Sequence, residues 1–137
     1  MSDVMFVYGS LMKNFHNYEK YLRGHVLDIQ PATVQGKLYD MPYKGYPAIL
    51  DGDDTVHGEV IHVKDLAAIL PAIDKMEGYN HQADDEYSRI PKTITLADGS
   101  TTVLDVYVYT SKHLDTQFEK EAIYLPEGSW RAFKESL

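Results

Sequence analysis

The chain of 137 residues contains no cysteine. Disulfide bonds, thiolate metal sites and a cysteine nucleophile are therefore excluded. Long hydrophobic runs are also missing, because no segment approaches the ~18 consecutive apolar residues that a membrane-spanning helix needs. The segment from Met1 to Leu11 lacks a basic stretch followed by a long apolar run, so a signal peptide is not expected. These absences predict a cytoplasmic protein with no membrane partner.

Basic residues are few. The chain has 13 Lys and Arg against 21 Asp and Glu, a formal net charge of -8. Since an acidic surface repels phosphate backbones, we expect no nucleic-acid partner. The length is typical of one domain, and we find no repeat, low-complexity tract or linker that would divide it. We therefore expect a single domain over residues 1–137, large enough to bury a hydrophobic core.

Apolar and alternating runs predict a chain dominated by strands. The expected strands cover 4–8, 26–30, 33–40, 46–50, 56–63, 87–96 and 101–110. Pro31 is expected to separate two of them, and Asp51-Gly52-Asp53-Asp54 is expected to form a turn. Asp98-Gly99, between two β-branched segments, predicts a hairpin.

Helical periodicity predicts short helices over 14–23, 65–77 and 129–135. Asn14, Asp65 and Ser129 are expected to cap them, and Gly24 and Gly78 to end the first two. Pro71 is expected to break the second helix, because proline lacks an N–H and clashes with the preceding turn. Together these elements predict an α+β fold, a small mixed, partly closed β-barrel of about six or seven strands with short flanking helices.

The histidines do not show the spacing of a metal site. His57 and His62 lie five positions apart on an expected strand, so they point to opposite faces. Asp51-Gly52-Asp53-Asp54 begins like a calcium loop, but Val56 and His62 stand where that loop needs glycine and glutamate. We therefore expect neither a metal nor a cofactor.

Two short segments carry candidate chemistry. The strand that ends at Gly9-Ser10-Leu11 would expose consecutive backbone N–H groups able to bind an anion, although an ordinary strand-to-helix turn is the alternative. Ser10 does not stand in a G-x-S-x-G elbow, so it is not an expected nucleophile. Glu77 follows an apolar helical stripe, where partial burial would raise the pKa of its carboxyl and suit it to proton transfer. A solvated or capping carboxylate is the alternative.

Tyrosine is abundant, with 11 residues in the chain. Several of them lie on or beside expected strands, where amphipathic rings can line a polar pocket or pack in the core. Tyr107 and Tyr109 would share one face of a strand.

Five segments follow one another along the chain in an informative order. They are Val7-Tyr8-Gly9-Ser10-Leu11-Met12, Tyr46-Pro47-Ala48-Ile49, Ile73-Asp74-Lys75-Met76-Glu77-Gly78-Tyr79, Glu86-Tyr87-Ser88-Arg89 and Val106-Tyr107-Val108-Tyr109. In order and rough spacing they resemble the γ-glutamylcyclotransferase-like (AIG2-like) family. The segment Gly128-Ser129-Trp130 is similar to a Gly-x-Trp element near that family's C-terminus.

The resemblance implies a pocket in which the Y-G-S-L loop offers backbone N–H groups to a small γ-glutamyl substrate. It implies that Glu77 is the general acid and base. The expected substrate-binding residues are Tyr8, Gly9, Ser10, Leu11, Tyr46, Tyr87 and Tyr109. The implied reaction closes a γ-glutamyl amine or γ-glutamyl amino acid into 5-oxoproline and frees the amine, in a monomer or homodimer without a cofactor.

This chemistry agrees with the residue types. The substrate's own α-amine attacks its γ-carbonyl, so no protein nucleophile is needed, as suits a chain without cysteine. The alternative is a non-catalytic small-molecule binding domain that uses the same pocket.

Overall fold

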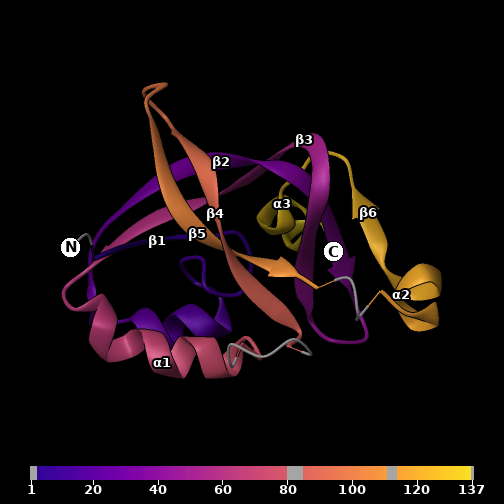
Figure 1. Ribbon diagram of the computed structural model, residues 1–137, viewed down its shortest axis with the longest axis horizontal. Coiled ribbons are helices and arrows are strands. Elements are labelled where there is room, and N and C mark those ends of the chain that lie inside the picture. Colours follow the sequence, from indigo (N-terminus) through magenta and orange to yellow (C-terminus); the bar gives the residue numbers. More distant parts are fainter. Residues whose placement is uncertain (1–2, 80–84, 111–113, 137) are drawn as a thin grey trace.

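A curved antiparallel sheet forms the body of the protein (Figure 1). The computed structural model describes residues 3–79, 85–110 and 114–136. Within these residues the strands are β1 (Val4–Val7), β2 (Val26–Met41), β3 (Tyr46–Val63), β4 (Tyr87–Leu96), β5 (Thr101–Tyr109) and β6 (Ile123–Leu125). Their order in the sheet is β1-β3-β2-β4-β5. Strand β6 pairs with residues 38–40 of β2. The predicted α+β class is confirmed, although the sheet curves without closing.

Strands β2 and β3 are much longer than predicted. The expected interruption at Pro31 is wrong, because Pro31 lies within β2 opposite Glu59 of β3. Strand β4 pairs with β2 at Ala32 and Thr33 but not at Pro31. The missing N–H of Pro31 therefore breaks no hydrogen bond to β4.

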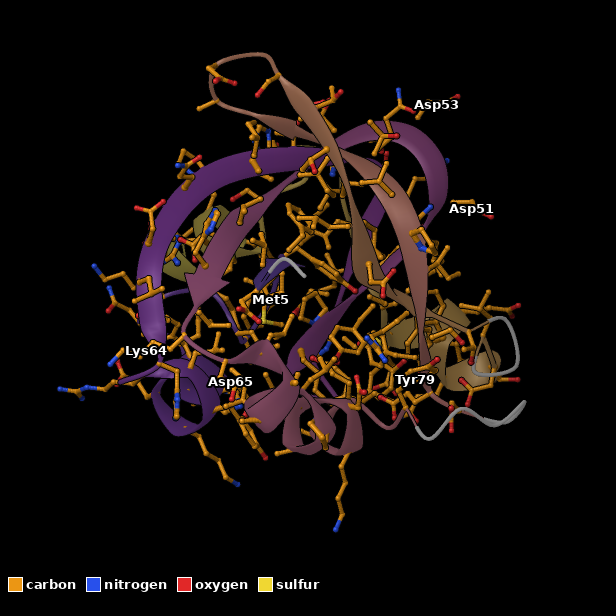
Figure 2. All side chains as sticks on the ribbon, turned by 60° about the vertical axis from the view of Figure 1, so that its left-hand side comes forward. Met5, Asp51, Asp53, Lys64, Asp65 and Tyr79 are labelled. Atoms are coloured by element: carbon orange, nitrogen blue, oxygen red, sulfur yellow. The ribbon has the colours of Figure 1, made fainter. Side chains whose placement is uncertain are left out.

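The expected turn at 51–54 is also wrong, because these residues continue β3 around a bend. A register shift between Gln35 and Lys37 of β2 accommodates that bend. Asp51 and Asp53 are exposed at the outside of the curve, whereas Met5 of β1 lies inside it (Figure 2). The polar residues that suggested a turn therefore form the outer surface of a bent strand.

The helices lie at the margins of the sheet. They are a short π-helix η1 (Tyr18–Leu22), then α1 (Leu66–Met76), α2 (Thr116–Glu121) and α3 (Trp130–Glu135). In Figure 1, η1 and α1 lie side by side along one edge of the molecule. The predicted helix over 14–23 is shorter than expected, because Asn14 adopts a positive φ of 77° and η1 begins only at Tyr18. Gly24 follows with the expected positive φ.

Helix α1 begins at the predicted cap, where Asp65 accepts a hydrogen bond from the amide of Ala68. The expected break at Pro71 is wrong, because the helix runs through this residue. Pro71 and Ala67 are both exposed, so water can satisfy the carbonyl that the missing N–H leaves free. Gly78 ends the helix as predicted, with a φ of 70°.

The C-terminal segment packs against the sheet. Ser129 caps α3 as predicted, and Trp130 is 1% exposed with its indole N–H donated to buried Asp40 at 2.8 Å. Helix α2 and strand β6 were not predicted, because both are short and Ile123 and Tyr124 of β6 are exposed. Among the described helices, none is long and apolar enough to span a membrane.

Candidate functional site

A pocket opens between the loop after β1, the end of α1 and the beginnings of β3 and β4. Its lining includes Tyr8, Gly9, Ser10, Leu11, Asn17, Tyr46, Glu77, Glu86, Tyr87 and Tyr107. Seven of the predicted site residues, from segments that are far apart in the sequence, therefore lie around one cavity. Tyr79, labelled in Figure 2, follows the end of α1 that carries Glu77.

The predicted loop lines this pocket with residues whose backbone amides are unpaired. The carbonyl of Gly9 accepts from the amide of Met12, and the carbonyl of Ser10 accepts from the amide of Tyr18. The amides of Gly9, Ser10 and Leu11 donate to no acceptor among the residues that the structure describes. Consecutive free N–H groups are suited to bind a carboxylate or an oxyanion.

Side chains from distant elements hold this loop in place. Glu59 of β3 accepts a hydrogen bond from the amide of Lys13 at 2.8 Å, and Arg131 of α3 donates to the carbonyl of Lys13 at 2.7 Å. Arg131 also pairs with Glu59 at 3.3 Å. Because α3 and β3 both fix Lys13, the amides before it are held before any ligand arrives.

Glu77 lies in the pocket at the C-terminal end of α1. Its backbone N–H bonds back to the carbonyl of Ile73, which places the side chain beyond the last helical turn. No donor among the described residues hydrogen-bonds its carboxyl group. Burial, together with the nearby charges of Glu86 and Asp74, raises the pKa of Glu77 to about 8 from an ordinary value of 4.5.

Asp74 connects the helix to the pocket wall. It is 8% exposed, accepts a hydrogen bond from Tyr107 at 2.5 Å and pairs with Arg89 at 3.1 Å. Arg89 in turn contacts the ring of Tyr79, with its guanidinium 5.2 Å from the ring centre. Asp74 is therefore a paired buried charge three residues before Glu77, where it opposes ionisation of that carboxyl.

The tyrosine hydroxyls at the pocket are already engaged. Tyr8 donates to the carbonyl of Tyr107 at 2.5 Å, and Tyr87 donates to the carbonyl of Pro47 at 2.5 Å. Tyr46 donates to Glu86. Burial raises the pKa of all three phenols, so they remain protonated in the physiological range. The three rings form rigid walls of the pocket, and their hydroxyl oxygens can still accept hydrogen bonds.

Tyr109 is placed differently from the other predicted residues. It does not line this pocket but packs edge-on against Tyr87, with ring centres 5.2 Å apart, and stacks on Phe118. Burial raises the pKa of its phenol. Tyr109 therefore packs behind Tyr87, which lines the pocket.

Two residues of the site were missed by sequence reasoning. Asn17 donates to the hydroxyl of Ser10 at 2.7 Å, which leaves the Ser10 hydrogen available to the pocket. Glu86 contributes a second carboxylate. Glu86 stands in one of the segments that resemble the family, but only the fold shows that it lines the same cavity as Glu77.

The structure also bears on metal binding. Among the described residues, no three histidine, aspartate or glutamate side chains are grouped so that they could hold a metal ion. Two of the histidines, His81 and His113, lie outside the described residues.

A sequence profile of the family described as "Gamma-glutamyl cyclotransferase, AIG2-like" matches residues 5–132. The chain belongs to this family. The match spans every segment of the pocket and confirms the resemblance noted from the motifs. No curated protein sequence matches this AIG2-like chain.

Solved structures share the AIG2-like fold. YkqA from Bacillus subtilis is 17% identical with a TM-score of 0.67, and the match covers 100% of this chain but 44% of YkqA. An AIG2-like protein from Mus musculus is 19% identical with a TM-score of 0.67, over 94% of this chain and 88% of its own. Allophanate hydrolase from Kluyveromyces lactis is 14% identical with a TM-score of 0.66, over 99% of this chain and 21% of its own. At these identities the likeness shows the fold alone.

Proposed function

We propose that this protein is a γ-glutamylcyclotransferase-type enzyme that converts a γ-glutamyl amine or γ-glutamyl amino acid into 5-oxoproline and the free amine. One observation carries the proposal. Glu77, a half-buried carboxyl with an elevated pKa, lines the same pocket as Gly9, Ser10 and Leu11, whose amides are free. A proton-transfer group and an anion-binding loop thus lie on one small cavity.

The loop supplies the positive end of the site. Among the described lining residues there is no lysine, arginine or histidine, so backbone dipoles are the available donors for an anion. The amides of Gly9, Ser10 and Leu11 can hold the substrate's carboxylate or the oxyanion that develops on its carbonyl. This arrangement suits a substrate that carries a carboxylate into an acidic protein.

Glu77 supplies a proton acceptor that is a stronger base than an ordinary glutamate. An ordinary glutamate has a pKa of about 4.5, far below that of an amine, whereas the pKa of Glu77 is raised to about 8. Because the raised value narrows this gap, a proton passes from the substrate's ammonium to Glu77 at a lower free-energy cost, and Glu77 can return it to a departing amine. An ordinary glutamate would be too weak a base to remove that proton efficiently.

The reaction balances without a cofactor or a protein nucleophile. Glu77 removes a proton from the α-ammonium, the freed amine attacks the γ-carbonyl carbon, and a carbon–nitrogen bond forms. The tetrahedral intermediate collapses with cleavage of the bond to the leaving amine. In total two protons leave the α-nitrogen and two end on the departing amine, with Glu77 as the shuttle. Because amine and carbonyl belong to one molecule, the pocket only has to hold the folded conformer in which the two groups meet.

The test measures release of 5-oxoproline from a panel of γ-glutamyl amines and γ-glutamyl amino acids. We expect turnover of at least one member, and a loss of about 100-fold or more in kcat for Glu77→Gln. Glu135→Gln is the matched control, because it makes the same change at an exposed position on α3.

Two outcomes would count against the proposal. If no member of the panel releases 5-oxoproline, the enzyme hypothesis fails. Thermal stabilisation by those compounds without turnover would then favour a non-catalytic binding domain. Unchanged activity in Glu77→Gln would instead show that another group transfers the proton.

A further inference from the structure

A second carboxylate, Glu86, lines the same pocket as Glu77. It precedes β4 directly, and its side chain is 22% exposed. One of its oxygens accepts a hydrogen bond from Tyr46, and the other pairs with Lys44 at 3.3 Å. Since both oxygens have fixed partners, the carboxylate is held in one orientation before a ligand binds.

The end of α1 brings Glu86 close to Glu77. Gly78 has a positive φ of 70°, and a Cβ added there would lie 3.3 Å from the Cβ of Glu86. The segment before β4 therefore packs directly on the residue that follows Glu77. The negative charge of Glu86 raises the pKa of Glu77, which is a further sign that the two groups face each other.

A second carboxylate beside Glu77 makes ionisation of Glu77 unfavourable in the empty pocket. Like charges repel, and the described lining residues include no cationic side chain to offset them. Lys44 neutralises Glu86 only from outside, because it does not line the cavity. A ligand with a positive charge would relieve this repulsion, whereas a neutral ligand would not.

We propose that Glu86 binds the α-ammonium group of the substrate and makes that group a requirement for binding. The proposal rests on the proposed function and identifies a specificity residue for it. The substrate's carboxylate lies at the amides of the loop, and its ammonium lies at the two carboxylates. Glu77 exchanges protons with the ammonium while the carboxylate of Glu86 holds the group in place.

A chemical consequence distinguishes this role from general support of the pocket. Glutaric acid monoamides match γ-glutamyl amides in every atom except the α-ammonium. Hydrogen bonds to charged groups are among the stronger ones, and the monoamide offers the Glu86 carboxylate no ammonium to pair with. We expect the monoamide to bind about 10- to 100-fold more weakly than the γ-glutamyl amide of the same amine.

The experiment compares these two ligands by calorimetry. It uses the γ-glutamyl amide with the highest kcat/KM in the panel and the glutaric acid monoamide of the same amine. Binding is measured on the Glu77→Gln protein, where turnover is suppressed, with and without Glu86→Gln. We expect Glu86→Gln to weaken binding of the γ-glutamyl amide about tenfold or more while binding of the monoamide changes little.

Lys44→Gln on the Glu77→Gln background is the matched control. It breaks the same ion pair but leaves the carboxylate in the pocket, so the preference for the γ-glutamyl amide should persist. If Glu86→Gln leaves that preference unchanged, or if Lys44→Gln abolishes it equally, the role of Glu86 is overturned. Equal binding of the two ligands to the Glu77→Gln protein overturns it as well, even if Glu86→Gln does not fold. Absence of 5-oxoproline release by the unsubstituted protein would overturn the proposed function instead.

Discussion

Tyr107 donates a hydrogen bond of 2.5 Å to Asp74, and this contact joins the wall of the pocket to the helix that carries Glu77. Arg89 completes the arrangement from the next strand, with its Nε 3.1 Å from the same carboxylate. Asp74 is 8% exposed, so Tyr107 and Arg89 are its partners within the fold. The network favours the protonated form of Glu77 without occupying its carboxyl group.

Replacement of Asp74 should change the pH dependence of the proposed activity. Asp74→Asn removes a negative charge near Glu77 and leaves the positive charge of Arg89 in place, so the pKa of Glu77 should fall from about 8. Glu86 remains as the other charge that raises it. We expect the acid limb of kcat/KM to move to lower pH, by on the order of one unit.

Asp105→Asn is the control for this measurement. Asp105 pairs with the same Arg89 at 3.6 Å, but its side chain is 50% exposed and it does not line the pocket. The acid limb should therefore stay in place. An unchanged limb in Asp74→Asn, or a shift to higher pH, would contradict the effect assigned to the Asp74 charge.

Glu77 should make the stability of the protein depend on pH. Its pKa is raised from 4.5 to about 8 in the folded state, so folding favours the protonated carboxyl. Its contribution is fully present below about pH 4.5 and is lost as the pH rises through about 8. At ~1.36 kcal/mol per pKa unit the shift corresponds to about 4–5 kcal/mol.

Glu77→Gln should lack this dependence, because glutamine does not titrate. We expect the free energy of unfolding of the original protein, measured by urea denaturation, to fall relative to Glu77→Gln between pH 5 and pH 9. The comparison cancels the titration of groups that the two proteins share. A constant difference over this range would mean that Glu77 is solvated like an ordinary carboxylate.

Gly9 should be required for the position of the anion-binding loop. A Cβ on Gly9 would lie 2.7 Å from Cγ and 2.8 Å from Cδ of Pro47, a side chain with little freedom to move. Gly9→Ala should therefore push the loop away from β3 and lower kcat/KM by about tenfold or more, because small misplacements of binding groups are costly.

Gly24→Ala provides a contrast in the same assay. Gly24 has a φ of 88° and nothing within 4 Å of the added Cβ, so the change costs only ~1–2 kcal/mol of backbone strain. Its thermal stability should fall while kcat/KM is retained. Equal activities of the two variants would show that contact with Pro47 does not set the loop.

Trp130 should contribute to stability through a polar contact as well as its size. Its indole N–H donates to Asp40 at 2.8 Å, and Asp40 is 2% exposed. Trp130→Phe keeps an aromatic ring but leaves the buried carboxylate without this donor, which should cost about 1–3 kcal/mol beyond the lost packing. In the Asp40→Ala background the same replacement should cost less. Additive effects in this cycle would disprove the coupling.

Some elements follow directly from local sequence. The hairpin of β4 and β5, the cap at Asp65, the helix end at Gly78 and the cap at Ser129 all occur where the residues predict them. Each depends on interactions within a few positions, such as a cap or a positive φ. The breaks predicted in β2 at Pro31 and in β3 at Asp51 do not exist. A strand accepts such residues where a neighbouring strand is missing or the sheet bends, and local sequence does not reveal either condition.

For this protein, sequence alone determined the family, the general architecture, the candidate loop and the candidate Glu77, because local motifs carry that information. Only the tertiary structure decided which side chains meet. It brought Glu86 to the same cavity as Glu77, fixed Asp74 against Tyr107, and placed Tyr109 behind Tyr87. These contacts join segments that are 9 to 33 positions apart, so they depend on strand register and sheet curvature. The apolar stripe before Glu77 predicted the direction of its pKa shift, whereas the charges of Glu86 and Asp74 that add to it are brought near by the fold.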